Sequence, residues 1–175
     1  MPDQGNSPNH CFHPWLPLKG FKAYRIEHGV PAAVSFARRD IYQVCLVTAK
    51  SRVCYSEKET EGNGHVLVFT KPNAAYSWGS NSQGQPGYNC LFTNEFLSKH
   101  PRLMSLLTSP LFGLGDIVVY PLTRAQNKSM AAIFQQILGA QDSHYVFKHE
   151  LIVDCLYWLT HEALKMQSPA NGNRS

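Results

Sequence analysis

Charged residues are scarce in this sequence, and the basic ones are not clustered. Asp, Glu, Lys and Arg make up 16% of the 175 residues, and the formal net charge is +4. A nucleic-acid-binding surface usually appears as a stripe or cluster of Lys and Arg. The scattered positive charges therefore give no indication that this chain itself binds DNA or RNA.

The sequence also lacks the motifs that accompany covalent or metal-dependent chemistry. It has no GxSxG motif, no glycine-rich phosphate loop, and no HxH or HExxH pattern among its eight His residues. Metal sites need several converging ligands, and Glu57, Glu59 and Glu61 alternate with other residues along a strand end that we expect to be solvated. We therefore expect a protein that is not an enzyme, with no catalytic residues, no metal and no cofactor.

Long hydrophobic runs and paired cysteines are missing too. No apolar run reaches the roughly 18 residues of a membrane span, and the polar N-terminus has no secretory signal. The five cysteines include no CxxC pair, and their apolar neighbours favour reduced, buried thiols. We expect a cytoplasmic protein, with a disulfide between Cys45 and Cys54 as the less favoured alternative.

What the sequence does contain is a series of short β-rich segments. The most informative is GHVLVFTKPNAAYSW at 64–78, where a dense β run, a Pro72-Asn73 turn and an aromatic-ended segment follow one another. This pattern is typical of a small closed β-barrel. Because only a short turn separates the segments at 40–48 and 52–58, we expect these two to form a hairpin. The predicted strands outside 64–78 are 21–28, 40–48, 52–58, 88–92 and 115–120.

The hydrophobic pattern changes to a helical period after Phe92. Thr93-Asn94 is expected to cap a short helix, and Pro101 suits the first turn of another. Thr123 and Gln126 match a capping box, and the apolar residues that follow lie on one helical face. A last helix is predicted over 145–166. The expected organisation is a disordered arm at 1–12, a β-barrel at 13–122, a helical segment at 123–167 and a linker or tail at 168–175.

Aromatic and polar residues on the predicted strands indicate a small-molecule pocket. Aromatic faces with a few fixed polar groups are typical of such pockets, and the planar Arg fork binds carboxylates or hydroxyls. A small barrel can hold one small ligand. The alternative is that the aromatic rings fill the barrel core and the Arg pair is solvated. The candidate ligand-binding residues are Arg38, Arg39, Tyr42, Tyr55, Phe69, Tyr76, Trp78 and Phe92.

The order of these segments resembles the N-terminal regulatory domain of AraC-type transcriptional regulators, the Bacteroidetes-like branch in particular. The resemblance covers about 13–167 and is carried by FARRDIYQVCLVTAKSRVCYSEKE, GHVLVFTKPNAAYSW, GYNCLFTNEFL and two helices ending in HEALKMQ. It implies a mainly β fold: a cupin-like barrel (double-stranded β-helix or jelly roll) followed by two α-helices. It also implies effector binding and dimerisation, with a C-terminal helix-turn-helix domain that this chain lacks.

The resemblance also implies roles for particular residues. In this family the N-terminal arm closes over the ligand, so Trp15 becomes a candidate lid residue. Cupin enzymes carry a His and Glu metal set, whereas Tyr76 and the Arg38-Arg39 pair stand where His is common, which favours an organic ligand without metal. The last helix would form the dimer interface. Its central residues would be Leu151, Cys155, Trp158 and Leu159.

The sequence thus predicts the effector-sensing and dimerisation domain of an AraC-family transcription regulator. Its ligand would be a small organic molecule such as a sugar or small organic acid, bound in a metal-free barrel. Its partners would be a second copy of the chain and, only through a C-terminal domain, DNA; no membrane partner is expected. Two alternatives stay open: a metal-dependent cupin enzyme such as an isomerase or dioxygenase, and a dimerisation module with a filled barrel that binds no ligand.

Overall fold

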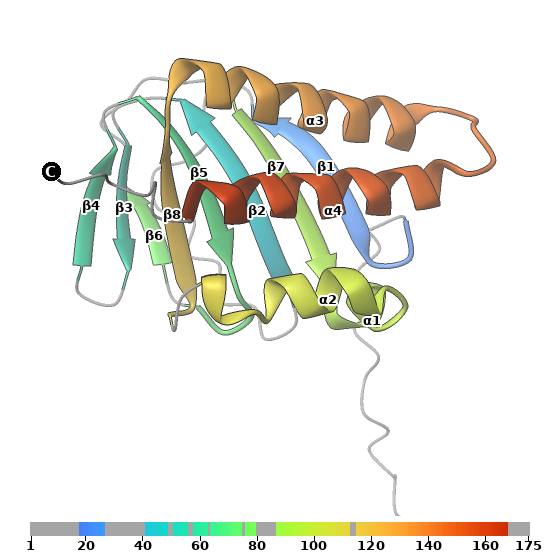
Figure 1. Cartoon of the computed structure of the whole chain (residues 1–175), viewed down its shortest axis with the longest axis horizontal. Coiled ribbons are helices and arrows are strands. Elements are labelled where there is room, and N and C mark those ends of the chain that lie inside the picture. The colour runs from blue at the N-terminus through green and yellow to red at the C-terminus, as the bar shows by residue number, and fades with distance from the viewer. Residues whose placement is uncertain are drawn as a thin grey trace, which may run out of the picture.

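A five-stranded antiparallel sheet is the centre of the fold (Figure 1). The computed structural model describes residues 18–26, 41–48, 51–55, 58–62, 64–74, 76–79, 87–112 and 115–167, with the backbone alone for the strands within 51–62 and 76–79. The sheet has the order β1-β7-β2-β5-β8. Its strands are β1 (Phe21–Ile26), β2 (Ile41–Thr48), β5 (His65–Thr70), β7 (Gly87–Thr93) and β8 (Ile117–Leu122).

A second, three-stranded sheet corrects one expectation about pairing. It consists of β3 (Ser51–Tyr55), β4 (Lys58–Gly62) and β6 (Tyr76–Gly79), in the order β4-β3-β6. The predicted hairpin of 40–48 with 52–58 is therefore wrong, because β3 pairs with β4 and β6 while β2 pairs with β5 and β7. A strand that is apolar on both faces, as β2 is, belongs in the middle of a buried sheet, where both of its edges are occupied.

The Pro72-Asn73 turn connects the two sheets. It follows β5 of the large sheet and leads to β6 of the small one, and Asn73 adopts a left-handed φ of 69°. Asn tolerates this region better than other non-glycine residues. Cys45 lies on β2 of the large sheet as a free, buried thiol, which rules out the disulfide with Cys54.

Two long helices cover one face of the large sheet, and short helices lie at its end (Figure 1). The long ones are α3 (Arg124–Asp142) and α4 (Lys148–Gln167); the others are α1 (Asn94–Ser98), α2 (Pro101–Leu107) and the 3-10 turn η1 (Pro110–Phe112). The predicted capping box is confirmed: Gln126 N donates to Thr123 Oγ1 (3.2 Å) and Thr123 N donates to Gln126 Oε1 (2.8 Å). Thr93 caps α1 as expected.

Strand alternation divides the buried residues of the sheet into two sets. Leu67 and Phe69 of β5 face α3 and α4, in one core with Phe134 and Leu159 of those helices. Val66 and Val68 face the other way, in a separate cluster. The large sheet is therefore buried on both faces. Among the described helices, none is long and apolar enough to cross a membrane.

The four residues expected at a dimer interface divide between two faces of α4. Cys155 and Leu159 are buried in the core of the single chain, because their face of the helix lies against the sheet and α3. Leu151 and Trp158 are 39% and 49% exposed. The surface of α4 that a partner can reach is therefore the one that carries Leu151 and Trp158.

A matched pair of substitutions on α4 measures this division. We expect Leu159→Ala to lower the free energy of unfolding by about 2–5 kcal/mol, since it opens a cavity in a closed core. Trp158→Ala, one residue away on the exposed face, is expected to lower the free energy of unfolding of the monomer by less than about 1 kcal/mol. Urea denaturation of the two variants at a concentration low enough for the chain to be monomeric checks this, and equal losses would contradict the assignment of the two faces.

Candidate functional site

Neighbouring residues at the ends of β2 and β5 point to opposite faces of the large sheet. Tyr42 and Phe69 face the helices, whereas Gln43 and Thr70 belong to the opposite set by alternation and are buried there. We call the helix-side group around Tyr42 and Phe69 the aromatic cleft. The opposite surface, which carries Tyr24, Gln43, Cys45, Val68, Thr70 and Asn89, is called the inner face.

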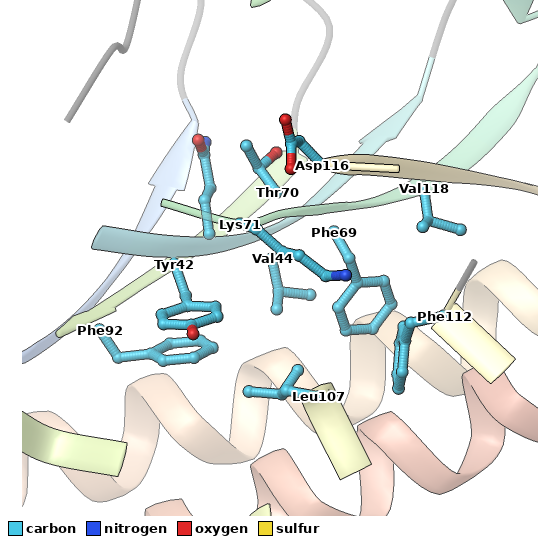
Figure 2. A pocket seen from close by; sticks show the side chains of 11 residues that line it. Tyr42, Val44, Phe69, Thr70, Lys71, Phe92, Leu107, Phe112, Asp116 and Val118 are labelled. Carbon is cyan, nitrogen blue, oxygen red and sulfur yellow. The ribbon is translucent and has the colours of Figure 1, made fainter. Parts of the chain in front are cut away.

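The aromatic cleft brings together three of the residues predicted from the sequence to bind ligand (Figure 2). The Tyr42 and Phe92 rings stack at 5.7 Å between centroids. Phe69 meets Phe112 of η1 edge to face at 4.8 Å. The cleft is lined by Tyr42, Gln43, Val44, Phe69, Thr70, Lys71, Phe92, Leu107, Phe112, Asp116 and Val118.

One cation lies beside this apolar lining. Figure 2 shows the Lys71 side chain on the same side of the sheet as the rings, whereas Thr70 and Asp116 point away from them. Lys71 N donates to the Asp116 backbone oxygen (2.8 Å), so its position is fixed by the backbone between β5 and β8. Within the described part of the chain, no acidic side chain forms an ion pair with Lys71.

The aromatic cleft is nearly filled by its own side chains. Its cavity volume is about 10 Å³, which is room for about one water molecule. Phe69, Phe92, Leu107 and Phe112 are all buried. In this conformation the three aromatic candidates therefore act as core residues. Their direction could not be read from the sequence, because β2, β5 and β7 are apolar on both faces.

The inner face has a different composition, because polar groups are buried in it. Tyr24, Asn89, Cys45 and Val68 lie side by side across four strands. Asn89 is 2% exposed and its Nδ2 donates to the Tyr24 hydroxyl at 2.6 Å. Asn89 Oδ1 has no hydrogen-bond partner, although a buried unpaired polar atom costs about 1–3 kcal/mol. Such an atom in a native fold calls for a water, an ion or a ligand.

The titratable groups of the inner face are uncharged at neutral pH. Burial raises the pKa of the Tyr24 hydroxyl, and it raises the pKa of the Cys45 thiol to about 12. A buried, protonated thiol is a poor nucleophile. Tyr24 keeps its proton for donation, and its oxygen accepts from Asn89. These groups can hold a polar ligand in place, but they are poorly suited to proton transfer or covalent chemistry.

For the remaining predicted ligand-binding residues, the structure gives strand register only or no description. On the small sheet Tyr55 is in register with Tyr76, and Trp78 with Val53. Arg38, Arg39 and Trp15 lie outside the described residues.

Sequence reasoning missed Tyr24 and Asn89 as site residues. The signal for Asn89 was present, because it is the lone amide in the apolar strand YNCLF. The signal for Tyr24 was the alternation of the segment FKAYRIEH, which places Tyr24 on the other face of the strand from Phe21 and Ala23.

Among solved structures, the chain is similar to ToxT from Vibrio cholerae. An apo variant matches with a TM-score of 0.56 and 11% identity, over 83% of this chain and 56% of that one. A second ToxT structure gives 0.52 and 12%, over 86% and 58%. ToxT bound to (E)-4-(8-methylnaphthalen-1-yl)but-3-enoic acid gives 0.50 and 14%, over 86% and 59%. No known protein family and no curated protein matches the sequence.

The similarity establishes the fold. The predicted architecture is confirmed: a cupin-type β domain followed by C-terminal helices. This chain spans less than three fifths of the length of the ToxT chains it matches.

A double-mutant cycle tests the hydrogen-bonding account of the inner face. Tyr24→Phe is expected to lower the free energy of unfolding by about 1–3 kcal/mol, because the Asn89 amide loses its partner. Asn89→Leu in the Tyr24→Phe background is expected to restore stability, since no unpaired amide remains. Thermal and urea denaturation of the ligand-free proteins measure both. An additive loss in the double variant would contradict the account.

Proposed function

We propose that this chain is the effector-sensing domain of an AraC-type transcription regulator, and that its effector binds at the inner face. The observation that carries the proposal is the buried amide of Asn89, whose second polar atom has no partner. The fold supports it, because ToxT is an AraC-family regulator with an N-terminal effector-binding domain. The sequence resemblance supports it independently and is alone in favouring the Bacteroidetes-like branch. DNA contact would belong to a domain outside this chain.

The polar groups of the inner face support a particular chemistry for the effector. A ligand group next to Asn89 and Tyr24 must complement one free amide atom and one hydroxyl proton, so it should both donate and accept hydrogen bonds. A hydroxyl, a carboxamide or a protonated carboxyl group meets this requirement. The rest of the ligand would pack against Val68 and Val119, which are aliphatic neighbours in register on β5 and β8.

The ToxT ligand is of a compatible kind. The naphthyl-substituted butenoic acid bound to ToxT joins one polar group to a large apolar body. We therefore favour a small organic acid or alcohol with an apolar body over a sugar, whose many hydroxyls would need more buried partners than this face provides. Lys71 lies on the other side of the sheet from Asn89 and Tyr24, so it would not contact the same polar group of the ligand.

An enzyme is the less favoured reading of this site. The structural neighbours are transcription regulators. The hydroxyl and thiol groups on the inner face have a raised pKa, whereas a general acid or base works best with a pKa near the operating pH.

A ligand screen with three variants tests the sensor proposal. Saturating effector at a hundredfold excess over Kd should raise stability by about 2.7 kcal/mol. We expect Asn89→Leu to fold normally but to lose this response to the small acids and alcohols that stabilise the wild type. Tyr24→Phe should weaken it. Thermal-shift measurements across a library of such compounds provide the readout.

The matched control for this screen is Tyr120→Phe. Its hydroxyl is also buried without a partner, but it belongs to the helix-side core. This variant should keep the full ligand response. A response that survives Asn89→Leu, or one lost equally in Tyr120→Phe, would show that the effector binds elsewhere.

We also propose that a second copy of the chain covers the exposed face of α4. Large apolar side chains continue from the loop before α4 along its outer face. They are Tyr145 (53% exposed), Val146 (84%), Phe147 (59%), Leu151 (39%) and Trp158 (49%). An exposed apolar patch of this kind marks an interaction site in a soluble domain. The sequence resemblance supports a dimer at this helix.

Sedimentation of one charge variant tests the dimer. Trp158→Asp places a charge in the proposed interface and is expected to give monomers. These monomers should remain folded, because the substitution lies on the exposed face of α4. Lys128→Asp, on the exposed side of α3, is the control and should leave the dimer intact. If the wild type sediments as a monomer at high concentration, the proposed interface is contradicted.

A further inference from the structure

Two histidines from distant parts of the chain meet at the junction of α2 and α4. His100 precedes α2 and His149 lies in the first turn of α4. Their Nε2 atoms are 3.2 Å apart, and their ring centroids are 5.2 Å apart with an interplanar angle of 42°. Both rings also contact Phe96, at 5.0 and 5.5 Å between centroids. The packing of Phe96 thus fixes both rings with their Nε2 atoms facing each other.

This separation suits two ligands of one metal ion. Imidazole nitrogens bind zinc at about 2.0–2.1 Å, so at a tetrahedral angle of about 109° two of them lie about 3.3 Å apart. The ring centroids of such a pair would be about 5.3 Å apart if the metal lies in the plane of each ring, on the line from the ring centroid through Nε2. Both observed distances agree with these values to within about 0.1 Å. The backbone need not move for the two rings to bind one ion.

The surroundings leave both rings available as ligands. Burial lowers the pKa of both rings; His149 lowers the pKa of His100 further, and Lys19 lowers the pKa of His149 further, while Glu150 acts in the opposite direction. Neutral rings offer a nitrogen lone pair without first losing a proton. In the metal-free protein the two Nε2 atoms share one hydrogen bond, which requires a proton on one of them. A metal ion would take the place of that proton.

We propose that His100 and His149 bind one divalent transition-metal ion through their Nε2 atoms. Imidazole ligands favour ions of the zinc, nickel and copper group over magnesium or calcium. Among the described residues, no third His, Cys, Asp or Glu joins the pair. Water or a small anion would therefore fill the remaining coordination positions of the ion.

A metal at this point would tie two functional parts of the molecule together. α2 carries Leu107 of the aromatic cleft, and α4 carries the exposed face proposed to meet a second copy. The bound ion would join the start of one helix to the start of the other. The site is independent of the effector proposal, because it shares no residue with the inner face.

Zinc titration of the whole chain tests the site. We expect isothermal titration to show one zinc ion per chain and thermal unfolding to shift upward with zinc concentration. His100→Ala and His149→Ala should each weaken zinc binding at least tenfold. His144→Ala and His161→Ala, which change other histidines beside or on α4, should bind zinc like the wild type.

Two further measurements keep the result interpretable. The titration is repeated in a chain whose His10, His13 and His28 are replaced by Ala, so that these three histidines cannot supply the signal. In that chain, zinc should shift only the Nε2 signals of His100 and His149 in ¹⁵N spectra of the imidazole rings. This readout keeps both histidines in place, so it does not depend on whether an Ala variant folds. The proposal is overturned if zinc leaves these signals unchanged, or if it binds equally well without His100 and His149.

Discussion

The packing of α3 and α4 against one face of the large sheet is the contact on which the rest of the structure depends. It buries the alternate residues of β2, β5 and β7 that include Leu46, Leu67 and Phe92. Burying this apolar surface supplies the main driving force for the fold. The opposite face of the same strands carries only smaller apolar clusters, around Val68 and Leu91, and it can therefore also hold a buried polar residue such as Asn89.

The inner face illustrates how a binding site can be retained at the expense of stability. A Leu at position 89 would remove an unpaired buried atom, yet the chain carries Asn there, hydrogen-bonded to Tyr24. Residues at functional sites are often worse for stability than apolar alternatives of the same size. Tyr120, whose hydroxyl is also buried without a partner, shows that an unpaired atom alone does not define a site. Asn89 differs because it lies in register between Tyr24 and Cys45, where polar groups are grouped together.

The sequence was informative wherever a local pattern determines the structure. The capping box at Thr123, the Thr93 cap and the period of the two long helices require only neighbouring residues, and all were predicted correctly. Strand partners depend on residues far apart in the chain, so β3 was assigned the wrong neighbour. The direction of Tyr42 and Phe69 could not be predicted for a related reason: a strand that is apolar on both faces has no alternation from which to read direction. The same limit applied to α4, whose wide apolar stripe contains both Leu159 and Trp158.

The sensor proposal requires a physical connection between the inner face and α4, and the packing provides a continuous one. Gln43 and Thr70 on the inner face are the immediate neighbours of Tyr42 and Phe69 in the aromatic cleft. That cleft has almost no free volume, so a shift of β2 or β5 must displace Leu107 or Phe112. Leu107 belongs to α2, which meets α4 at His100 and His149. Contact alone does not make this connection allosteric, because coupling exists only if the effector binds two arrangements of these helices with different affinity. The close packing of the cleft favours two discrete arrangements over a gradual one, since tightly packed side chains exchange between alternative positions instead of deforming continuously.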